Sequence, residues 1–174
     1  MRELSCIGFI KLKVLIFCMF CISSCHKEDA EGYAIVAHDF MVNVTREQTF
    51  QMALAERLGK NPSRQKIEEI VNARKKFSSD YISELNSLKP SSQNPLQVSF
   101  SDEQTNALRA IDQISGISHE DKLLKELMDS DQVMIALHVK AVSNSGVSDE
   151  MVRNWAEQKL PALRENLKET QNLK

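Results

Sequence analysis

Cysteine is confined to the start of this chain of 174 residues. The four cysteines are Cys6, Cys18, Cys21 and Cys25, and none follows them. The part of the chain after Cys25 therefore has no thiol, which excludes a disulfide framework and a cysteine nucleophile there.

Glycine, proline and aromatic residues are also scarce, at 5 residues, 4 residues and 6% of the chain. Aromatic and β-branched residues are sparse, whereas Leu, Ala, Glu, Lys and Gln are plentiful. This composition favours helices. The 22 basic and 24 acidic residues nearly balance, with a formal net charge of −2. Because nucleic-acid binding needs a basic face, we predict no nucleic-acid partner.

The N-terminal segment has the order of a secretory signal. Arg2, Lys11 and Lys13 precede an uninterrupted apolar run at 14–22, and small residues follow it. A membrane-spanning helix needs about 20 apolar residues, and extending this run backwards meets two lysines that are costly in hydrocarbon. We therefore predict a signal peptide at residues 1–24.

The tetrad Ile-Ser-Ser-Cys at 22–25 resembles the bacterial lipobox, in which an aliphatic residue and two small residues precede the cysteine that is lipidated. Cys18 and Cys21 lack small residues before them, and Cys6 precedes the apolar run. We predict lipidation at Cys25, which makes the membrane a partner through the lipid. The alternatives are an uncleaved hydrophobic N-terminus and a eukaryotic signal cleaved by a different enzyme.

Residues 25–33 are predicted to be the lipidated cysteine and a tether, and residues 34–174 a single helical domain. Within the tether, Lys-Glu-Asp at 27–29 resembles a surface-export signal of some Gram-negative groups, and the alternative is an ordinary solvated tether. The predicted location is the outer membrane, with the protein on its periplasmic or its surface-exposed side.

Apolar residues recur at helical spacing in four long segments. The first is expected from Tyr33 to Leu58, where Gly59 ends it. The second is expected to begin at Pro62, behind an Asn61 cap, and to stop before residue 89. Its apolar stripe is made of Ile67, Ile70, Val71, Arg74, Phe77, Tyr81, Leu85 and Leu88.

Ser101 and Gln104 form a capping box that opens a short helix, which is expected to stop at Gly116. Ser118 is expected to open the next long helix and Ser148 the last one. Pro161 falls inside the last helix and is expected to kink it. Four long amphipathic helices, one short helix and no strand pattern predict an all-α, antiparallel four-helix bundle with one extra short helix.

Polar residues fall on the apolar stripes at Tyr81, Asp131 and Asn166. With Asp80 and His138 they form the candidate interior polar cluster. A buried carboxylate needs a partner, so Asp131 is expected to lie at a bundle end or to bond to Tyr81, Asn166 or His138. A ligand site is the alternative.

No motif of a known reaction accompanies these residues. No histidine follows a glutamate by three positions, as the two-iron site of ferritin-like bundles requires. His-Glu-x-x-His, Gly-x-Ser-x-Gly and phosphate-binding loops do not occur either. We predict no catalytic residues, no metal and no cofactor.

Three segments resemble successive signatures of domain of unknown function family 4142. They are "IVNARKKFSSDYISEL" (70–85), "LMDSDQVMIALHVKAV" (127–142) and "DEMVRNWAEQKLPALRENL" (149–167). The family consists of exported bacterial proteins that are often lipoproteins, and the resemblance covers residues 38–172. It implies a ferritin-like helical bundle and a location in the cell envelope.

The chain departs from this family at the family's histidines. Asp80-Tyr81 stands where the family has Asp-His, Asp131 or Gln132 stands at a second histidine, and Asn166 stands at the third. These histidines are the family's candidates for a metal or proton-handling site, so the resemblance does not carry such a site to this chain. The family's activity is unassigned, and the resemblance implies no reaction.

The sequence therefore predicts a non-enzymatic cell-envelope lipoprotein, whose bundle is a binding or structural module for an unidentified envelope protein. One alternative is a metal-binding or residual ferritin-like redox domain that uses Asp80, Tyr81, Asp131 and His138. Another is a small-molecule carrier with a pocket between helices near Pro161.

Overall fold

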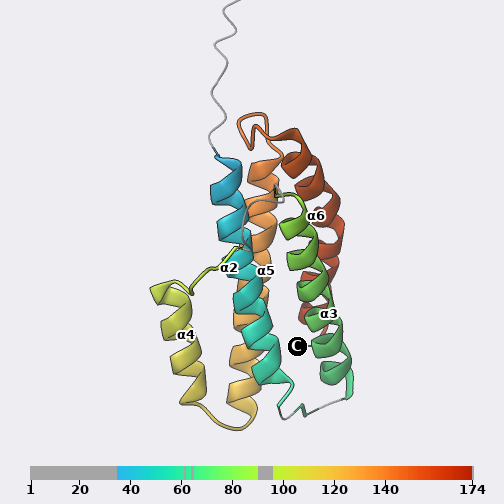
Figure 1. Ribbon diagram of the computed structural model, residues 1–174. Coiled ribbons are helices and arrows are strands. Elements are labelled where there is room, and N and C mark those ends of the chain that lie inside the picture. Colours follow the sequence, from blue (N-terminus) through green and yellow to red (C-terminus); the bar gives the residue numbers. More distant parts are fainter. Residues whose placement is uncertain (1–34, 61, 64, 90–95, 174) are drawn as a thin grey trace, which may run out of the picture. The chain divides into compact units, whose positions relative to one another are not determined.

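The computed structural model describes residues 35–60, 62–63, 65–89 and 96–173, and in this part of the chain the regular structure is five helices with no strand (Figure 1). The all-α prediction is confirmed. The predicted signal peptide, Cys25 and tether lie outside the described residues. The helices are α2 (Ala37–Leu58), α3 (Gln65–Ser87), α4 (Asp102–Asp112), α5 (Ile117–Ala141) and α6 (Glu150–Gln171).

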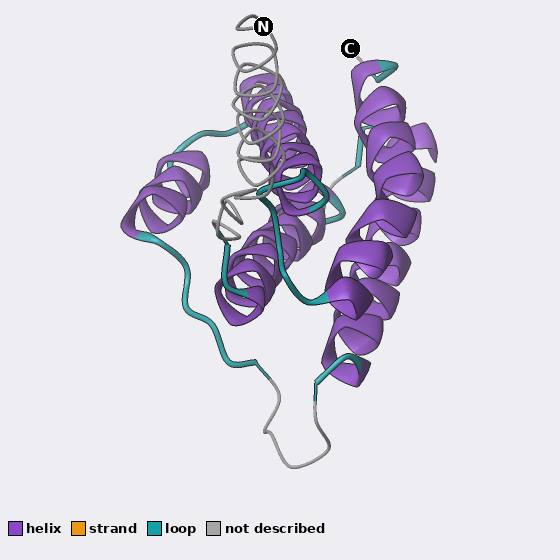
Figure 2. Cartoon of the chain, turned by 90° about the horizontal axis from the view of Figure 1, so that it is seen from above, coloured by secondary structure: helices purple, strands orange, loops and turns teal. Residues whose placement is uncertain are grey.

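The four long helices pack as a helical bundle. Helix α5 packs against α2 and α6, and α3 packs against the same two helices. Helices α3 and α5 are therefore diagonal to each other. The short α4 lies outside this group and packs on α5, as the view from above also shows (Figure 2).

The interior has two apolar clusters with buried polar side chains between them. One cluster includes Phe40, Tyr81 and Trp155, and the other includes Phe50 and Leu124. Most buried polar positions of the long helices fall between the positions that belong to the two clusters, whereas His138 lies within the first cluster and Gln51 directly follows Phe50 of the second. The bundle is thus apolar at two levels and polar at a level between them.

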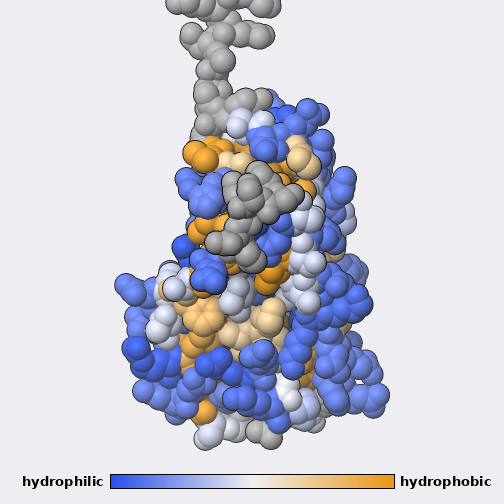
Figure 3. Space-filling model, viewed as in Figure 1, coloured by the Kyte–Doolittle hydropathy of each residue, from blue (hydrophilic) through white to orange (hydrophobic). Residues whose placement is uncertain are grey.

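Hydrophilic side chains cover much of the outer surface, and apolar side chains show between them along the middle of the face in Figure 3. Among the described residues, no helix is long and apolar enough to cross a membrane. The large apolar side chains that are exposed are Val36, Ile114, Ile117, Val133, Val139 and Met151.

The predicted capping box of α4 is confirmed. The Gln104 N–H donates to Ser101 Oγ, and the Ser101 N–H donates to Gln104 Oε1, both at 3.1 Å. The helix ends at Asp112 instead of Gly116. Gly116 instead precedes α5 with a φ of 71°, a left-handed conformation that glycine adopts without a steric penalty. The prediction that Ser118 opens this helix is wrong, because α5 begins at Ile117.

The turn between α2 and α3 also depends on glycine. Helix α2 ends at Leu58, as predicted, and a Cβ added to Gly59 would lie 2.8 Å from Val71 Cγ1. The absence of a side chain lets the end of α2 approach α3. Helix α3 begins at Gln65, so the prediction that Pro62 is its first residue is wrong.

Helix α6 is capped by Asp149, and the prediction of Ser148 is wrong. Asp149 Oδ1 accepts the Val152 N–H at 3.0 Å. The helix contains Pro161 and is continuous from Glu150 to Gln171.

The two adjacent cap candidates allow a matched test. Asp149→Ala is expected to lower the free energy of unfolding by about 1 kcal/mol, because the Val152 N–H loses its acceptor. Ser148→Ala is expected to change it by less than about 0.5 kcal/mol, as for an ordinary surface substitution. Urea unfolding of both variants measures the two effects, and equal losses would contradict the cap assignment.

Candidate functional site

A buried ion pair joins α3 to α5. Arg74 Nη1 donates to Asp131 Oδ1 and Arg74 Nη2 donates to Asp131 Oδ2, both at 2.6 Å. The two side chains are 3% and 0% exposed. This forked geometry is the strongest form of charge-assisted hydrogen bonding between side chains. Because α3 and α5 are diagonal, the pair reaches across the middle of the bundle.

The other two long helices complete this contact. Gln51 of α2 donates from Nε2 to Asp131 Oδ1 at 3.0 Å. On the side of α6, Arg74 Nη2 donates to Thr170 Oγ1 at 2.6 Å and to the main-chain carbonyl of Asn166. All four long helices therefore supply a partner to one ion pair.

Two further buried hydrogen bonds extend the network, one within α2 and one from α2 to α3. Gln48 Nε2 donates to Gln51 Oε1 at 3.2 Å and to Ser78 Oγ at 2.6 Å. We call this set the polar layer. It consists of the side chains of Gln48, Gln51, Arg74, Ser78, Asp131 and Thr170 with the Asn166 carbonyl.

The electrostatics of the polar layer combine two opposing effects. Burial raises the pKa of the Asp131 carboxyl, because the interior solvates the charged form poorly. Hydrogen bonds from Arg74 and Gln51 act in the opposite direction. Both carboxylate oxygens are engaged by these donors, and the charge is matched by a cation in direct contact.

A second buried pair lies in the apolar cluster that contains Trp155. Tyr81 Oη lies 3.0 Å from His138 Nε2, and His138 Nδ1 lies 2.7 Å from the Met134 carbonyl oxygen. A carbonyl only accepts hydrogen bonds, so the proton of the neutral imidazole is on Nδ1. Nε2 then accepts the phenol O–H of Tyr81, and both rings have their polar atoms satisfied.

Aromatic rings surround this pair. The ring centroids of Tyr81 and Trp155 are 4.8 Å apart, and those of Phe40 and His138 are 5.4 Å apart. The Trp155 indole N–H donates to Glu84 Oε2 at 3.1 Å. This N–H points toward the outside of the bundle, since the Glu84 side chain is half exposed.

Burial keeps both members of the pair uncharged at neutral pH. It lowers the pKa of His138 to about 4, and the nearby Lys159 acts in the same direction. Burial also raises the pKa of Tyr81 well above its usual value, and the charge of Glu84 adds to this. The hydrogen bond between them is therefore one between neutral groups.

The predicted interior cluster is divided by the structure. Tyr81 and His138 lie together, whereas Asp131 lies in the polar layer and Asn166 contributes a carbonyl to it. Asp80 does not belong to the interior: its side chain is 56% exposed and pairs with Lys76 Nζ at 2.5 Å. Asp80 directly precedes Tyr81 on α3, and consecutive helical residues point about 100° apart, so its side chain points away from the face that holds Tyr81.

The expected partners of Asp131 were also wrong. Asp131 bonds to Arg74 and Gln51, and neither of them belongs to the predicted cluster. A signal for Arg74 was present, because it is the one charged residue on the apolar stripe predicted for the second helix. A cation at such a position needs a buried anion.

The ligand set of the alternative metal-binding prediction does not converge. Tyr81 and His138 bond to each other, Asp131 bonds to Arg74, and Asp80 lies outside. Within the described part of the chain, no group of three or more His, Cys, Asp or Glu side chains could hold a metal ion.

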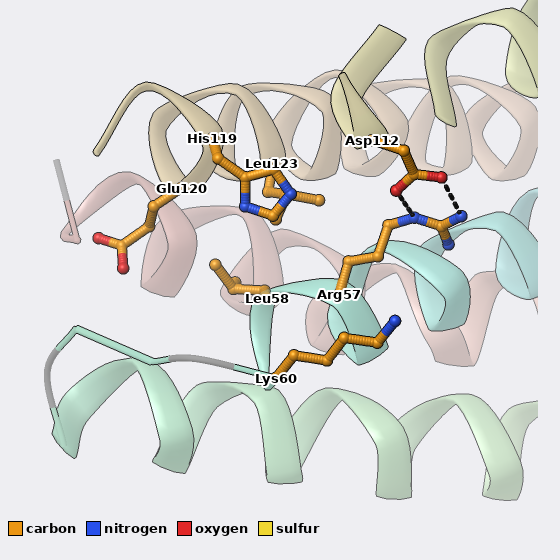
Figure 4. A pocket seen from close by; sticks show the side chains of 7 residues that line it. All are labelled: Arg57, Leu58, Lys60, Asp112, His119, Glu120 and Leu123. Atoms are coloured by element: carbon orange, nitrogen blue, oxygen red, sulfur yellow. Dashed lines mark hydrogen bonds and ion pairs between the residues drawn. The ribbon is translucent and has the colours of Figure 1, made fainter. Parts of the chain in front are cut away.

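A cavity of about 180 Å³ lies where α2, α4 and α5 meet (Figure 4). Arg57 donates from Nε and Nη2 to the two carboxylate oxygens of Asp112, at 2.9 and 3.0 Å. This pair joins the end of α2 to the end of α4, and the Arg57 hydrogen bond lowers the pKa of Asp112. The remaining lining residues are Leu58, Lys60, His119, Glu120 and Leu123.

No family model, curated protein or solved structure matches this chain. The resemblance to family 4142 therefore remains a prediction.

The ion pair can be tested by removing one partner or both. Arg74→Met or Asp131→Leu alone is expected to lower the free energy of unfolding by about 3–5 kcal/mol, because the other charge stays buried without a partner. The double substitution is expected to recover most of this loss, since no buried charge remains. Urea unfolding of the four proteins gives the coupling energy.

The exposed pair of Lys76 and Asp80 on the same helix is the matched control. Replacing either by Ala is expected to change the free energy of unfolding by less than about 1 kcal/mol, as for other solvent-exposed pairs. Losses of similar size at Asp131 and at Asp80 would contradict the structural assignment.

The buried histidine predicts a loss of stability in acid. The pKa of His138 is about 4 in the folded protein and 6.5 as the reference value. Between these values the unfolded chain binds a proton that the folded protein does not. The free energy of unfolding should therefore fall as the pH drops from 7 to 4, by roughly 3 kcal/mol from this group.

His138→Gln removes the titrating group while leaving an acceptor for Tyr81. Urea unfolding at several pH values compares parent and variant, so that contributions from other groups cancel. The difference in the free energy of unfolding between parent and variant is expected to be constant above pH 7. In acid the parent is expected to lose more stability than the variant. Parallel profiles down to pH 4 would contradict the assignment.

Proposed function

We propose that this chain is a cell-envelope lipoprotein, held at the outer membrane by a lipid on Cys25, whose helical bundle is a non-enzymatic binding or structural module. The lipobox-like tetrad and the signal pattern before it support the anchor. The module would present its surface to an envelope protein partner on the periplasmic or the outer side of the membrane.

The proposal of a binding or structural module rests on one observation, which is that the interior polar groups pair with each other. Arg74 and Asp131 neutralise each other, and Tyr81 and His138 satisfy each other's hydrogen bonds. Catalytic acids, bases and ligands need a free valence toward a substrate. These groups instead bond to each other across helices. In the described part of the chain, the buried side-chain atoms without a hydrogen-bond partner are Gln48 Oε1, Arg74 Nε and Asn166 Nδ2. The use of the two pairs between helices favours a scaffold.

We further propose that the bundle is ferritin-like and antiparallel, with α4 as the extra short helix, and that the chain is a divergent relative of family 4142. In ferritin-like proteins the metal lies in the bundle core among ligands from facing helices. Here the core cation is the Arg74 guanidinium, bonded to α5 and α6. This supports a bundle whose core is organised around a side-chain cation.

The anchor is tested by Cys25→Ala in the full chain. The variant is expected to move from the membrane fraction to the soluble fraction and to lose incorporation of a labelled fatty acid, because the acylated thiol is gone. Fractionation and labelling of cells measure both effects.

Cys21→Ala is the matched control, since Cys21 precedes the predicted cleavage point. It should leave fractionation and labelling unchanged. A Cys25→Ala protein that stays bound and labelled like the parent would overturn the lipoprotein proposal.

A further inference from the structure

We propose that the cavity where α2, α4 and α5 meet binds a small carboxylate ligand, with its anionic group held by Lys60, His119 and Arg57 and its apolar part on two buried leucines (Figure 4). This binding activity goes beyond the proposed module function and does not depend on the lipid anchor. The cavity has no lining residue from α6, so it is not the pocket near Pro161 that the sequence offers as an alternative.

Two of the lining side chains carry unused hydrogen-bond donors. Among the described residues, no hydrogen-bond partner is found for the Lys60 ammonium or for the His119 ring. In Figure 4 both side chains extend toward Arg57. An ammonium has three N–H donors and a neutral imidazole has one. A carboxylate between these side chains would accept from both of them, and a bond from a charged donor is among the stronger hydrogen bonds.

Arg57 is a fixed part of the cavity wall that also has donors left. Its Nε and Nη2 donate to Asp112, and its Nη1 donates to the Ala53 carbonyl at 3.2 Å. These bonds use three of the five N–H groups of a guanidinium, which leaves two. Because the forked pair holds the guanidinium in place, a ligand meets a donor that is already positioned.

Asp112 does not cancel the positive charge of the cavity, because Arg57 neutralises it. The hydrogen bond from Arg57 is the main cause of the lowered pKa of Asp112, and the charges of Lys60 and His119 act in the same direction. All three cationic groups therefore act on one region, which holds one carboxylate that is already paired.

Glu120, the other carboxylate at the cavity, is directed elsewhere. Its Oε2 accepts the Ser63 N–H at 3.3 Å. In Figure 4 its carboxylate points away from Lys60 and from the His119 ring. The ammonium of Lys60 therefore favours an anion in the cavity.

The size and the floor of the cavity determine the rest of the ligand. Leu58 and Leu123 are 3% and 1% exposed and give the cavity an apolar surface beside the charges. Its volume of about 180 Å³ is similar to that of an engineered cavity of about 150 Å³ that binds benzene. A carboxylate on a ring or a short alkyl chain covers the leucines, whereas inorganic phosphate leaves them uncovered. The cavity therefore favours an organic carboxylate.

The cavity is accessible from solvent at the ion pair. The side chains of Arg57 and Asp112 are 24% and 53% exposed. A ligand can therefore reach the cavity without opening the bundle. Water and salt screen the charges at such a site, and we expect a dissociation constant on the order of 1 mM for a ligand of this size.

The test uses benzoate as the probe and benzamide, which has the same shape and no charge, as the matched control. The full chain is purified in a non-ionic detergent, with ¹³C in its histidine rings, and titrated with each compound. Benzoate is expected to shift the ring signals of His119, which His119→Gln assigns. The signals of His38 and His138 should stay unchanged, since neither residue lines the cavity. Benzamide should bind about tenfold more weakly, because it forms no charge-assisted bond.

Lys60→Gln removes the ammonium at an exposed turn and should leave the fold intact. It is expected to weaken benzoate binding about tenfold, the typical loss of one hydrogen bond to a charged group. Lys168→Gln is the matched control, because Lys168 is an exposed lysine that pairs with Glu165 on α6. It should leave the affinity unchanged.

The proposal is overturned if the His119 signals do not respond to benzoate, if benzoate and benzamide bind equally, or if Lys60→Gln leaves the affinity for benzoate unchanged. Inorganic phosphate is titrated as well. Binding of phosphate as tight as that of benzoate would overturn the assignment to organic carboxylates, because the two leucines would then contribute nothing.

Discussion

The contact between Arg74 and Asp131 is the constraint on which the arrangement of the bundle depends. A guanidinium in the core is tolerated only where acceptors surround it, and here they come from Asp131, Thr170 and the Asn166 carbonyl. A buried ion pair adds little net stability over apolar packing, because removing both charges from water is costly. It does fix geometry, since sliding any one long helix by a turn would leave a buried charge or amide without its partner. Apolar side chains alone would tolerate such a shift more easily.

The second buried pair follows from this alignment. Tyr81 lies seven residues after Arg74 on α3, and His138 lies seven residues after Asp131 on α5. Seven residues are two helical turns, or about 10 Å along the axis. Because the two offsets are equal and have the same sign, α3 and α5 run in the same direction, and the ion pair brings tyrosine and histidine to one level. The alignment of one pair therefore determines the hydrogen bond of the other.

The sequence predicts the helices and their buried faces better than the contacts between them. The capping box of Ser101 depends on four adjacent residues and could be read directly, whereas Ser148 and Asp149 are both good caps and only the backbone path distinguishes them. Tyr81 could be assigned to the core from its place on a stripe. Asp80 could not belong there, because consecutive helical residues point about 100° apart. The Arg74–Asp131 pair joins residues 57 positions apart, a distance over which periodicity on one helix gives no information.

The Arg74–Asp131 pair and the Tyr81–His138 pair both give buried polar groups a partner, but they do so with different chemistry. In the polar layer the two charges are joined by two forked hydrogen bonds. Moving a proton from Arg74 to Asp131 would replace the ion pair by two neutral groups and lose these charge-assisted bonds. Tyr81 and His138 are both neutral and share one hydrogen bond, and burial disfavours a charge on either group. Their rings pack with the ring of Trp155. The polar layer is therefore suited to holding the helices in register, because a shift would leave a charge without its partner, whereas the aromatic level above it adds packing around one neutral hydrogen bond.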